Sequence, residues 1–289
     1  MDQRFNQREL EMMARHEAMY KDFFLNPFKY YMAPFKIYGN VYYVGDEKVC
    51  MHLIDTGEGL ILIDTGFPHT KHQLIQAIWE AGFDPRDLKY VIITHGHFDH
   101  YGAACQLRGL YGCKLCLSEG DAPILEKMRP KKGTLPVEEY PIGTFEPDIV
   151  IHECETIKLG NTVVETIPVP GHSPGVLAFF IETEENGVKK RCGLIGGVGL
   201  AGMSGKFIRE RGESFDKQTN FLRALDRIYD EKVDIVLGNH PNDNRTVEKR
   251  KQMLESPDGP NPFVDPGEWK QLIDRLRGQM AQIMADNDK

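Results

Sequence analysis

Short apolar runs broken by glycine-containing turns dominate the chain from Phe35 onward. The breaks fall at Gly39-Asn40, at Gly45-Asp46 and at residues 57–59, and glycine beside asparagine or aspartate is typical of turns. The pattern therefore predicts an antiparallel meander with strands at residues 35–38, 41–44, 49–54 and 60–63.

Apolar residues that recur every three to four positions predict helices after this meander. The predicted helices cover residues 70–81, 100–110, 121–128 and 215–230, and two further helices close the chain, the last of which carries Trp269 to Ile283. Apolar runs too short for helices predict buried strands at residues 90–94, 114–117 and 234–237.

A second set of strands occupies the middle of the chain. The predicted strands cover residues 149–151, 156–159, 162–167, 177–182 and 188–195, and we expect them to form a second meander. Residues 129–147 are rich in proline and glycine and predict a surface loop, and residues 196–205 are dense in glycine.

Strands followed by helices thus occur twice along the chain. Two sheets that face each other, with helices outside, would bury the apolar faces of both sheets, so the predicted fold class is α/β (α+β). We expect one domain over residues 31–289, preceded by an N-terminal helical extension at residues 1–30 with a helix near residues 7–24.

Composition narrows the class of protein. Apolar residues make up 41% of the 289 residues and charged residues 27%, which is ordinary for a globular protein. No apolar stretch approaches the roughly 20 residues needed to span a bilayer, so we expect no membrane helix. The first 25 residues are charged throughout and lack the apolar core of a secretory signal, which predicts a cytoplasmic protein unless a leader has been removed.

The charge balance and the cysteines exclude further roles. The net charge of −8, from 35 basic and 43 acidic residues, argues against nucleic-acid binding as the main role. We expect a small-molecule substrate. The oligomeric state stays open.

The six cysteines are expected to be free thiols. Cys113 and Cys116 form a C-x-x-C that is typical of a strand with alternating faces.

One segment concentrates residues that bind metals. The β-branched run that ends at Thr94 is followed by His95, His97, Asp99 and His100, four metal-ligating types within six residues. A buried strand that feeds a tight turn provides a rigid anchor for such a cluster. Imidazole and carboxylate ligands suit zinc and, less selectively, iron, manganese or cobalt.

Two further histidines share this setting, in which a strand end is followed by a turn. His172 lies in Gly171-His-Ser-Pro-Gly175 after one predicted strand, and His240 follows the strand at residues 234–237. Each alone is more typical of a structural histidine, but a metal cluster that needs further ligands favours both as ligands. His69 and His72, at the start of a predicted helix, are weaker candidates for the rim of such a site.

These motifs together resemble the metallo-β-lactamase superfamily. The resemblance rests on H-x-H-x-D-H at residues 95–100, with Asp64-Thr65-Gly66 before it and Gly171-His172 after it. Residues 34–45, 156–175 and 233–241 are most similar to subclass B3 enzymes. The resemblance implies a four-layer αββα sandwich with the metals at the edge of the sheets.

The resemblance also implies two Zn²⁺ ions and a ligand set for each of them. One zinc would be held by His95, His97 and His172, and the other by Asp99, His100 and His240. Asp99 would be the catalytic residue that orients the nucleophile and relays its proton, and Asp64 would orient a metal-binding histidine. The implied activity is that of a dizinc hydrolase that opens a cyclic amide, foremost a β-lactam, by attack of a metal-bound hydroxide.

Two departures keep other activities open. Superfamily hydrolases of lactones, thioesters and phosphoesters carry an aspartate that bridges the two metals, where this chain has Gly197-Val198. Subclass B3 enzymes also lack a bridging side chain there. The serines that assist carboxylate binding in B3 enzymes are missing, so hydrolysis of a lactone, thioester or phosphoester stays an alternative. An iron-dependent oxidoreductase is less favoured because such members carry glutamate at the position of His97, and a non-catalytic protein would be expected to lose ligands.

Overall fold

The computed structural model describes residues 21–128 and 143–287. Most of the helix predicted near residues 7–24 and of the loop predicted at 129–147 lies outside the described residues, although residues 21–25 are helical. The division into an extension at 1–30 and one domain at 31–289 stays a prediction.

Seven strands form the first sheet, and they lie in the same order in the sheet as in the sequence. The strands are β1 (Phe35–Tyr38), β2 (Val41–Tyr43), β3 (His52–Asp55), β4 (Leu60–Ile63), β5 (Leu88–Ile92), β6 (Lys114–Ser118) and β7 (Ile149–Ile151). Strands β1 to β4 pair antiparallel, which confirms the predicted meander, and β5 to β7 are added in parallel.

The second sheet has five strands in the order β12-β11-β10-β9-β8. The strands are β8 (Thr156–Leu159), β9 (Thr162–Pro168), β10 (Leu177–Glu185), β11 (Val188–Ile195) and β12 (Ile235–Leu237). Neighbours from β8 to β11 pair antiparallel, and β12 returns parallel to β11 after two helices.

The prediction that residues 149–151 begin the second meander was wrong. Strand β7 pairs in parallel with β6, so that Cys116 faces Ile149 across the edge of the first sheet. The alternation of apolar residues predicts a strand but does not encode which sheet the strand joins, because pairing depends on the path of the preceding connection.

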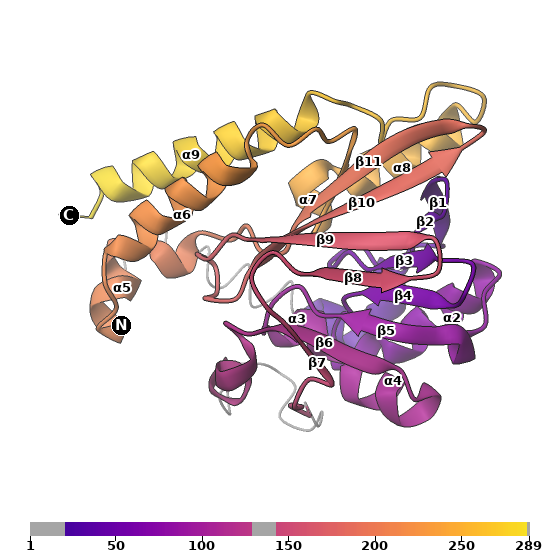
Figure 1. The fold of residues 1–289 in the computed structure, drawn as a ribbon, viewed down its shortest axis with the longest axis horizontal. Coiled ribbons are helices and arrows are strands. Elements are labelled where there is room, and N and C mark those ends of the chain that lie inside the picture. Colours follow the sequence, from indigo (N-terminus) through magenta and orange to yellow (C-terminus); the bar gives the residue numbers. More distant parts are fainter. Residues whose placement is uncertain (1–20, 129–142, 288–289) are drawn as a thin grey trace.

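Helices cover the outer face of each sheet (Figure 1). The helices with described bounds are α2 (Lys71–Glu80), α3 (Phe98–Tyr101), α4 (Ala104–Tyr111), α5 (Gly205–Arg211), α6 (Asp216–Ile228), α7 (Pro241–Asn244), α8 (Thr246–Glu255) and α9 (Glu268–Ala285). Helices α2 and α4 pack on the first sheet, and α6 and α9 pack on the second. Helix α8 instead packs through Val247 and Met253 on the layer between the sheets. The predicted αββα sandwich is thereby confirmed.

Three apolar layers hold this sandwich together. The central layer lies between the sheets and includes Ile61 and Ile92 of the first sheet with Phe179 and Leu194 of the second, all buried. Burying each side chain of this kind contributes about 1.5–3 kcal/mol. In the outer layer of the second sheet, Trp269 of α9 is 1% exposed and its indole N–H donates to the carbonyl of Ile228 at 2.8 Å.

Two local differences concern helices. The helix predicted at 100–110 is divided into α3 and α4 around Gly102, where a Cβ would lie 2.4 Å from the backbone nitrogen of Pro68. Helix α5 was not predicted, because its glycine-dense start is typical of a loop; the Ser204 side chain accepts from the Phe207 N–H at the beginning of this helix.

The six cysteines are free thiols. Cys113 packs in the layer beneath the helices and Cys116 packs between the sheets, as expected for a strand with alternating faces. None of the helices in the described part of the chain is long and apolar enough to cross a bilayer.

Candidate metal centre

The predicted ligands all lie just after strands that end at one edge of the sandwich. His95 and His97 occupy the turn between β5 and α3, and Asp99 and His100 lie on α3 itself. His172 follows β9, and His240 immediately precedes α7 after β12. The site is therefore assembled from strand ends of both sheets.

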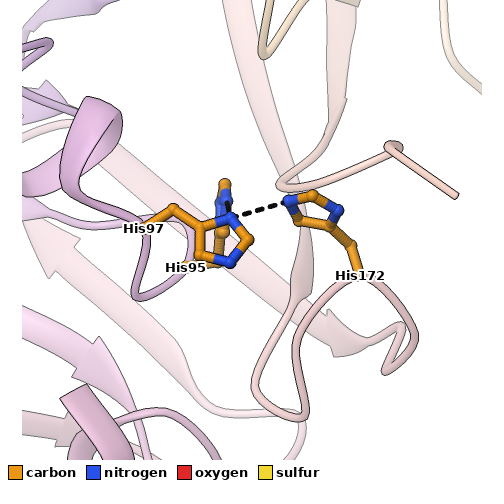
Figure 2. A group of neighbouring side chains, drawn as sticks. All are labelled: His95, His97 and His172. Carbon is orange, nitrogen blue, oxygen red and sulfur yellow. Dashed lines mark hydrogen bonds between the residues drawn. The ribbon is translucent and has the colours of Figure 1, made fainter. Parts of the chain in front are cut away.

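The first group consists of His95, His97 and His172, whose ligating atoms all lie within 4.8 Å of one another. The Nδ1 atom of His97 is 3.0 Å from Nε2 of His95 and 2.9 Å from Nε2 of His172. Figure 2 shows His172 facing the other two rings from the opposite side. Three nitrogens that converge in this way match the donor set of one zinc ion.

The second group consists of Asp99, His100 and His240, and their ligating atoms also lie within 4.8 Å of one another. Nε2 of His100 lies 3.3 Å from Nε2 of His240. Oδ2 of Asp99 lies 3.4 Å from the first of these nitrogens and 3.6 Å from the second. Two imidazoles and one carboxylate again suit a divalent metal.

The outer nitrogens of three of these rings are held by acceptors. Nδ1 of His172 donates to the carbonyl of Gly199 at 2.7 Å, and Nδ1 of His240 donates to the carbonyl of Lys48 at 2.8 Å. Nδ1 of His100 lies 2.7 Å from Oδ2 of Asp64. A proton held at Nδ1 leaves the lone pair of Nε2 directed into the site, as metal-binding histidines require.

Asp64 is buried at the centre of the hydrogen bonds behind the second group. It has a φ of 62°, a backbone conformation that is uncommon outside glycine. Its Oδ1 accepts from the Thr94 N–H at 2.8 Å, and its Oδ2 accepts from the Thr94 hydroxyl at 2.8 Å and the Asn239 amide at 3.2 Å. The structure thus places Asp64 against His100, where the sequence predicted an orienting carboxylate.

Burial keeps the first group neutral. It lowers the pKa of His97 to about 4, with His172 adding to the effect, and it lowers the pKa of His95 well below the usual histidine range. Burial also lowers the pKa of His172. All three rings are therefore unprotonated near neutral pH, and their lone pairs are available to a metal.

The second group carries charge. Burial alone would lower the pKa of His100, but the carboxylates of Asp99 and Asp64 raise it to about 10. Burial alone would raise the pKa of Asp99, but the charge of His100 and its hydrogen bond lower it far below the usual range. Asp99 is therefore ionised, and His100 carries an extra proton that a metal must displace.

In the stretch after β11, the backbone of two glycines lies against a ring of the first group. A Cβ on Gly197 would lie 2.8 Å from the ring of His172, and one on Gly199 would lie 3.0 Å from it. The side chain of Val198 packs against the core beneath α6 and α9. At this stretch the chain therefore presents no bridging carboxylate, as the sequence predicted.

Several residues that support the site were not singled out from the sequence. Thr94 and Asn239 surround Asp64, the carbonyls of Lys48 and Gly199 fix two rings, and Asp121 lies behind the turn at Gly96. Asp121 follows a buried strand as the ligands do, so its position carried a usable signal. The backbone carbonyls of Lys48 and Gly199 leave no such signal in the sequence.

His69, a weaker candidate from the sequence, belongs to neither group of predicted ligands. Its ring is enclosed by Phe23, Phe24 and Phe67.

Comparison with known proteins places this geometry in a family. The model of the metallo-beta-lactamase superfamily matches residues 40–185, half of the chain, and the match contains the strand end, the turn and the four predicted ligands at residues 95–100. The chain belongs to the metallo-beta-lactamase superfamily.

The relatives that match this chain carry names that indicate different substrates. The chain is 32% identical over 171 residues to the hydroxyacylglutathione hydrolase GloC of Haemophilus influenzae, covering 58% of this chain and 74% of that protein. It is 28% identical over 162 residues to an N-acyl homoserine lactonase of Bacillus thuringiensis, covering 48% of this chain and 60% of the lactonase. The match thus spans less than two thirds of the lactonase.

Solved structures of subclass B3 metallo-beta-lactamases are similar over nearly the whole chain. BJP-1, a subclass B3 metallo-beta-lactamase of Bradyrhizobium japonicum, superposes with a TM-score of 0.79 at 26% identity. The superposition covers 91% of this chain and 98% of BJP-1. The predicted closeness to subclass B3 is confirmed at the level of structure.

Metal binding by the two groups should depend differently on pH. At about pH 6, we expect the first zinc to bind without proton release and the second to displace about one proton from His100. Between about pH 6 and 5, where a zinc-bound water with a pKa near 7 stays neutral, lowering the pH should therefore weaken binding of the second zinc about tenfold and leave the first nearly unchanged.

Zinc titration calorimetry in buffers of different ionisation enthalpy measures this release. Equal proton release by the two zinc ions would contradict the charge distribution described above.

Proposed function

We propose that this protein is a dizinc hydrolase that opens a cyclic amide, foremost a β-lactam. The observation that carries the proposal is the pair of three-ligand groups, His95, His97 and His172 beside Asp99, His100 and His240. All six residues that the resemblance implied converge in two compact sets. The lack of a bridging carboxylate at Gly197-Val198 supports a B3-like activity within the superfamily.

The donor atoms fit zinc. Each group offers three ligating atoms of the nitrogen and carboxylate type, and a catalytic zinc site has three protein ligands and one open position. Zinc bound in such sites polarises a carbonyl oxygen and lowers the pKa of a water ligand towards about 7. Iron and manganese share this donor preference less selectively, so the metal content needs direct measurement.

The residues of the chain prepare the site for this chemistry. The neutral rings of the first group offer lone pairs without a proton to remove, because burial lowers the pKa of His95, His97 and His172. Asp99 is ionised, because its pKa lies far below the usual range, and its Oδ2 projects between the two histidines of the second group. An ionised carboxylate there can accept a hydrogen bond from an attacking water and orient it.

A second candidate activity is hydrolysis of a thioester or lactone. The sequence relatives favour it, since one is named a hydroxyacylglutathione hydrolase and covers 58% of this chain, and others are named N-acyl homoserine lactonases. The glycine backbone against His172 counts against it, because such enzymes carry a bridging aspartate at that stretch. An iron-dependent oxidoreductase is less favoured, because His97 stands where such members carry glutamate.

The proposed partner is a small molecule. The net charge of −8 disfavours nucleic acid.

Turnover of a chromogenic cephalosporin by zinc-loaded protein tests the substrate. We expect ring opening that a chelator abolishes and added zinc restores, with kcat/KM at least about tenfold above that for a thioester or an acyl lactone. Preference for the thioester or lactone would replace the β-lactam with the second candidate. Turnover of all three that is unaffected by chelator would contradict the metal-dependent mechanism.

Replacement of one ligand should abolish activity without unfolding the protein. His97→Ala removes the nitrogen that lies nearest to both partners of the first group, and we expect turnover to fall by at least about a thousandfold. The far-ultraviolet circular dichroism and the thermal midpoint of the metal-free protein should match those of the unmodified chain. His152→Ala, which changes an exposed histidine paired with Glu119, is the matched control and should keep activity. Full activity of His97→Ala after metal analysis would contradict the assignment.

A further inference from the structure

Asp121 is a fully buried carboxylate that touches none of the proposed metal ligands directly. It lies just after β6 at the edge of the first sheet where the ligands converge, and it is 0% exposed. A buried ionised carboxylate is costly unless its oxygens accept several hydrogen bonds, so its partners indicate what it does.

The partners of Asp121 come from two separate turns. Its Oδ2 accepts from the N–H of Gly96 at 2.8 Å and from the hydroxyl of Ser173 at 2.6 Å. Its Oδ1 accepts from the N–H of Gly175 at 2.7 Å. Gly96 lies between His95 and His97, and Ser173 follows His172. One carboxylate therefore joins the two turns that carry all three ligands of the first group.

Steric contacts hold these turns in the same relation. A Cβ on Gly175 would lie 2.1 Å from the Ser118 hydroxyl oxygen, and one on Gly120 would lie 2.7 Å from Cα of Gly175. The turn after His172 thus rests with its backbone against the turn that contains Asp121. This close approach leaves the carboxylate within reach of both turns.

The second group has a different carboxylate behind it. Asp64 contacts the ring of His100 and both the N–H and the hydroxyl of Thr94, and among the described residues its carboxylate bonds to no residue of the turn after His172. Asp64 holds a ring of the second group and reaches the first group through the Thr94 hydroxyl, which lies 3.2 Å from Nδ1 of His95. Asp121 instead holds the backbone on either side of the first group.

We propose that Asp121 is a positioning residue that sets the metal affinity of the first group by holding the turn after β5 to the turn after β9. These turns belong to different sheets, and His172 must approach His97 to within the 2.9 Å seen between their nitrogens. Loss of the carboxylate frees the two turns to separate, and a metal would have to order them again on binding. The inference rests on the metal centre of the proposed function but not on its substrate.

Zinc affinity in two single-site backgrounds tests this proposal. His240→Ala keeps the first group complete, and His97→Ala keeps the second group complete. In the His240→Ala background, Asp121→Asn should weaken zinc binding about 10- to 100-fold, as is usual when support behind metal ligands is lost. In the His97→Ala background, the same change should weaken binding less than about threefold. Chelator competition measures both affinities, and cobalt absorption spectra report the geometry of the first group.

Two further variants separate positioning from general damage to the fold. Ser173→Ala removes one of the three hydrogen bonds and should give a smaller loss in the first group only. Asp148→Asn is the matched control, because Asp148 accepts from the Leu115 N–H near the opposite end of β6, and it should change neither affinity. If Asp121→Asn does not fold, Ser173→Ala carries the test. Unchanged affinity of the first group, or an equal loss in both groups, would overturn the proposal. These readouts do not involve turnover, so they stand even if no β-lactam is hydrolysed.

Discussion

The packing of two sheets across one apolar layer is the constraint on which the candidate site depends. The ligands of the first group come from the end of β5 in one sheet and from the end of β9 in the other. The central layer, with residues such as Ile92 and Phe179, fixes the distance between these sheets. Close-packed protein interiors deform little, so the ends of β5 and β9 meet in one arrangement. A change of register in either sheet would carry His172 away from His95 and His97.

Burial and neighbouring charges give the histidines of the two groups different pKa values. The first group consists of three rings whose pKa values burial lowers, and its support is the backbone around Gly96 and Ser173. In the second group, His100 lies between the carboxylates of Asp64 and Asp99, and its pKa is about 10. A metal that bound the second group would therefore displace a proton, whereas one that bound the first group would meet neutral donors.

The sequence could single out the candidate ligands because each of them follows a strand that is evident from its apolar run. His95, His172 and His240 share that setting, and the structure brings all six predicted residues into two groups. The predicted pairing of β7 was wrong, and α5 was not predicted. Neither the pairing of strands that are distant in sequence nor the helix cap at Ser204 produces a periodic pattern of apolar residues. The support from Asp121 and from the carbonyls of Lys48 and Gly199 depends on contacts across long sequence separations. Patterns along the chain do not record such contacts.

A crystal structure of the zinc-loaded protein, with anomalous diffraction recorded at the zinc edge, tests the central claim most directly. Two anomalous peaks are predicted, one enclosed by His95, His97 and His172 and the other by Asp99, His100 and His240. The nitrogens that face these peaks should be Nδ1 of His97 and Nε2 of the other histidines, since their opposite nitrogens point outward. No peak at either group, or peaks bound by other residues, would contradict the account.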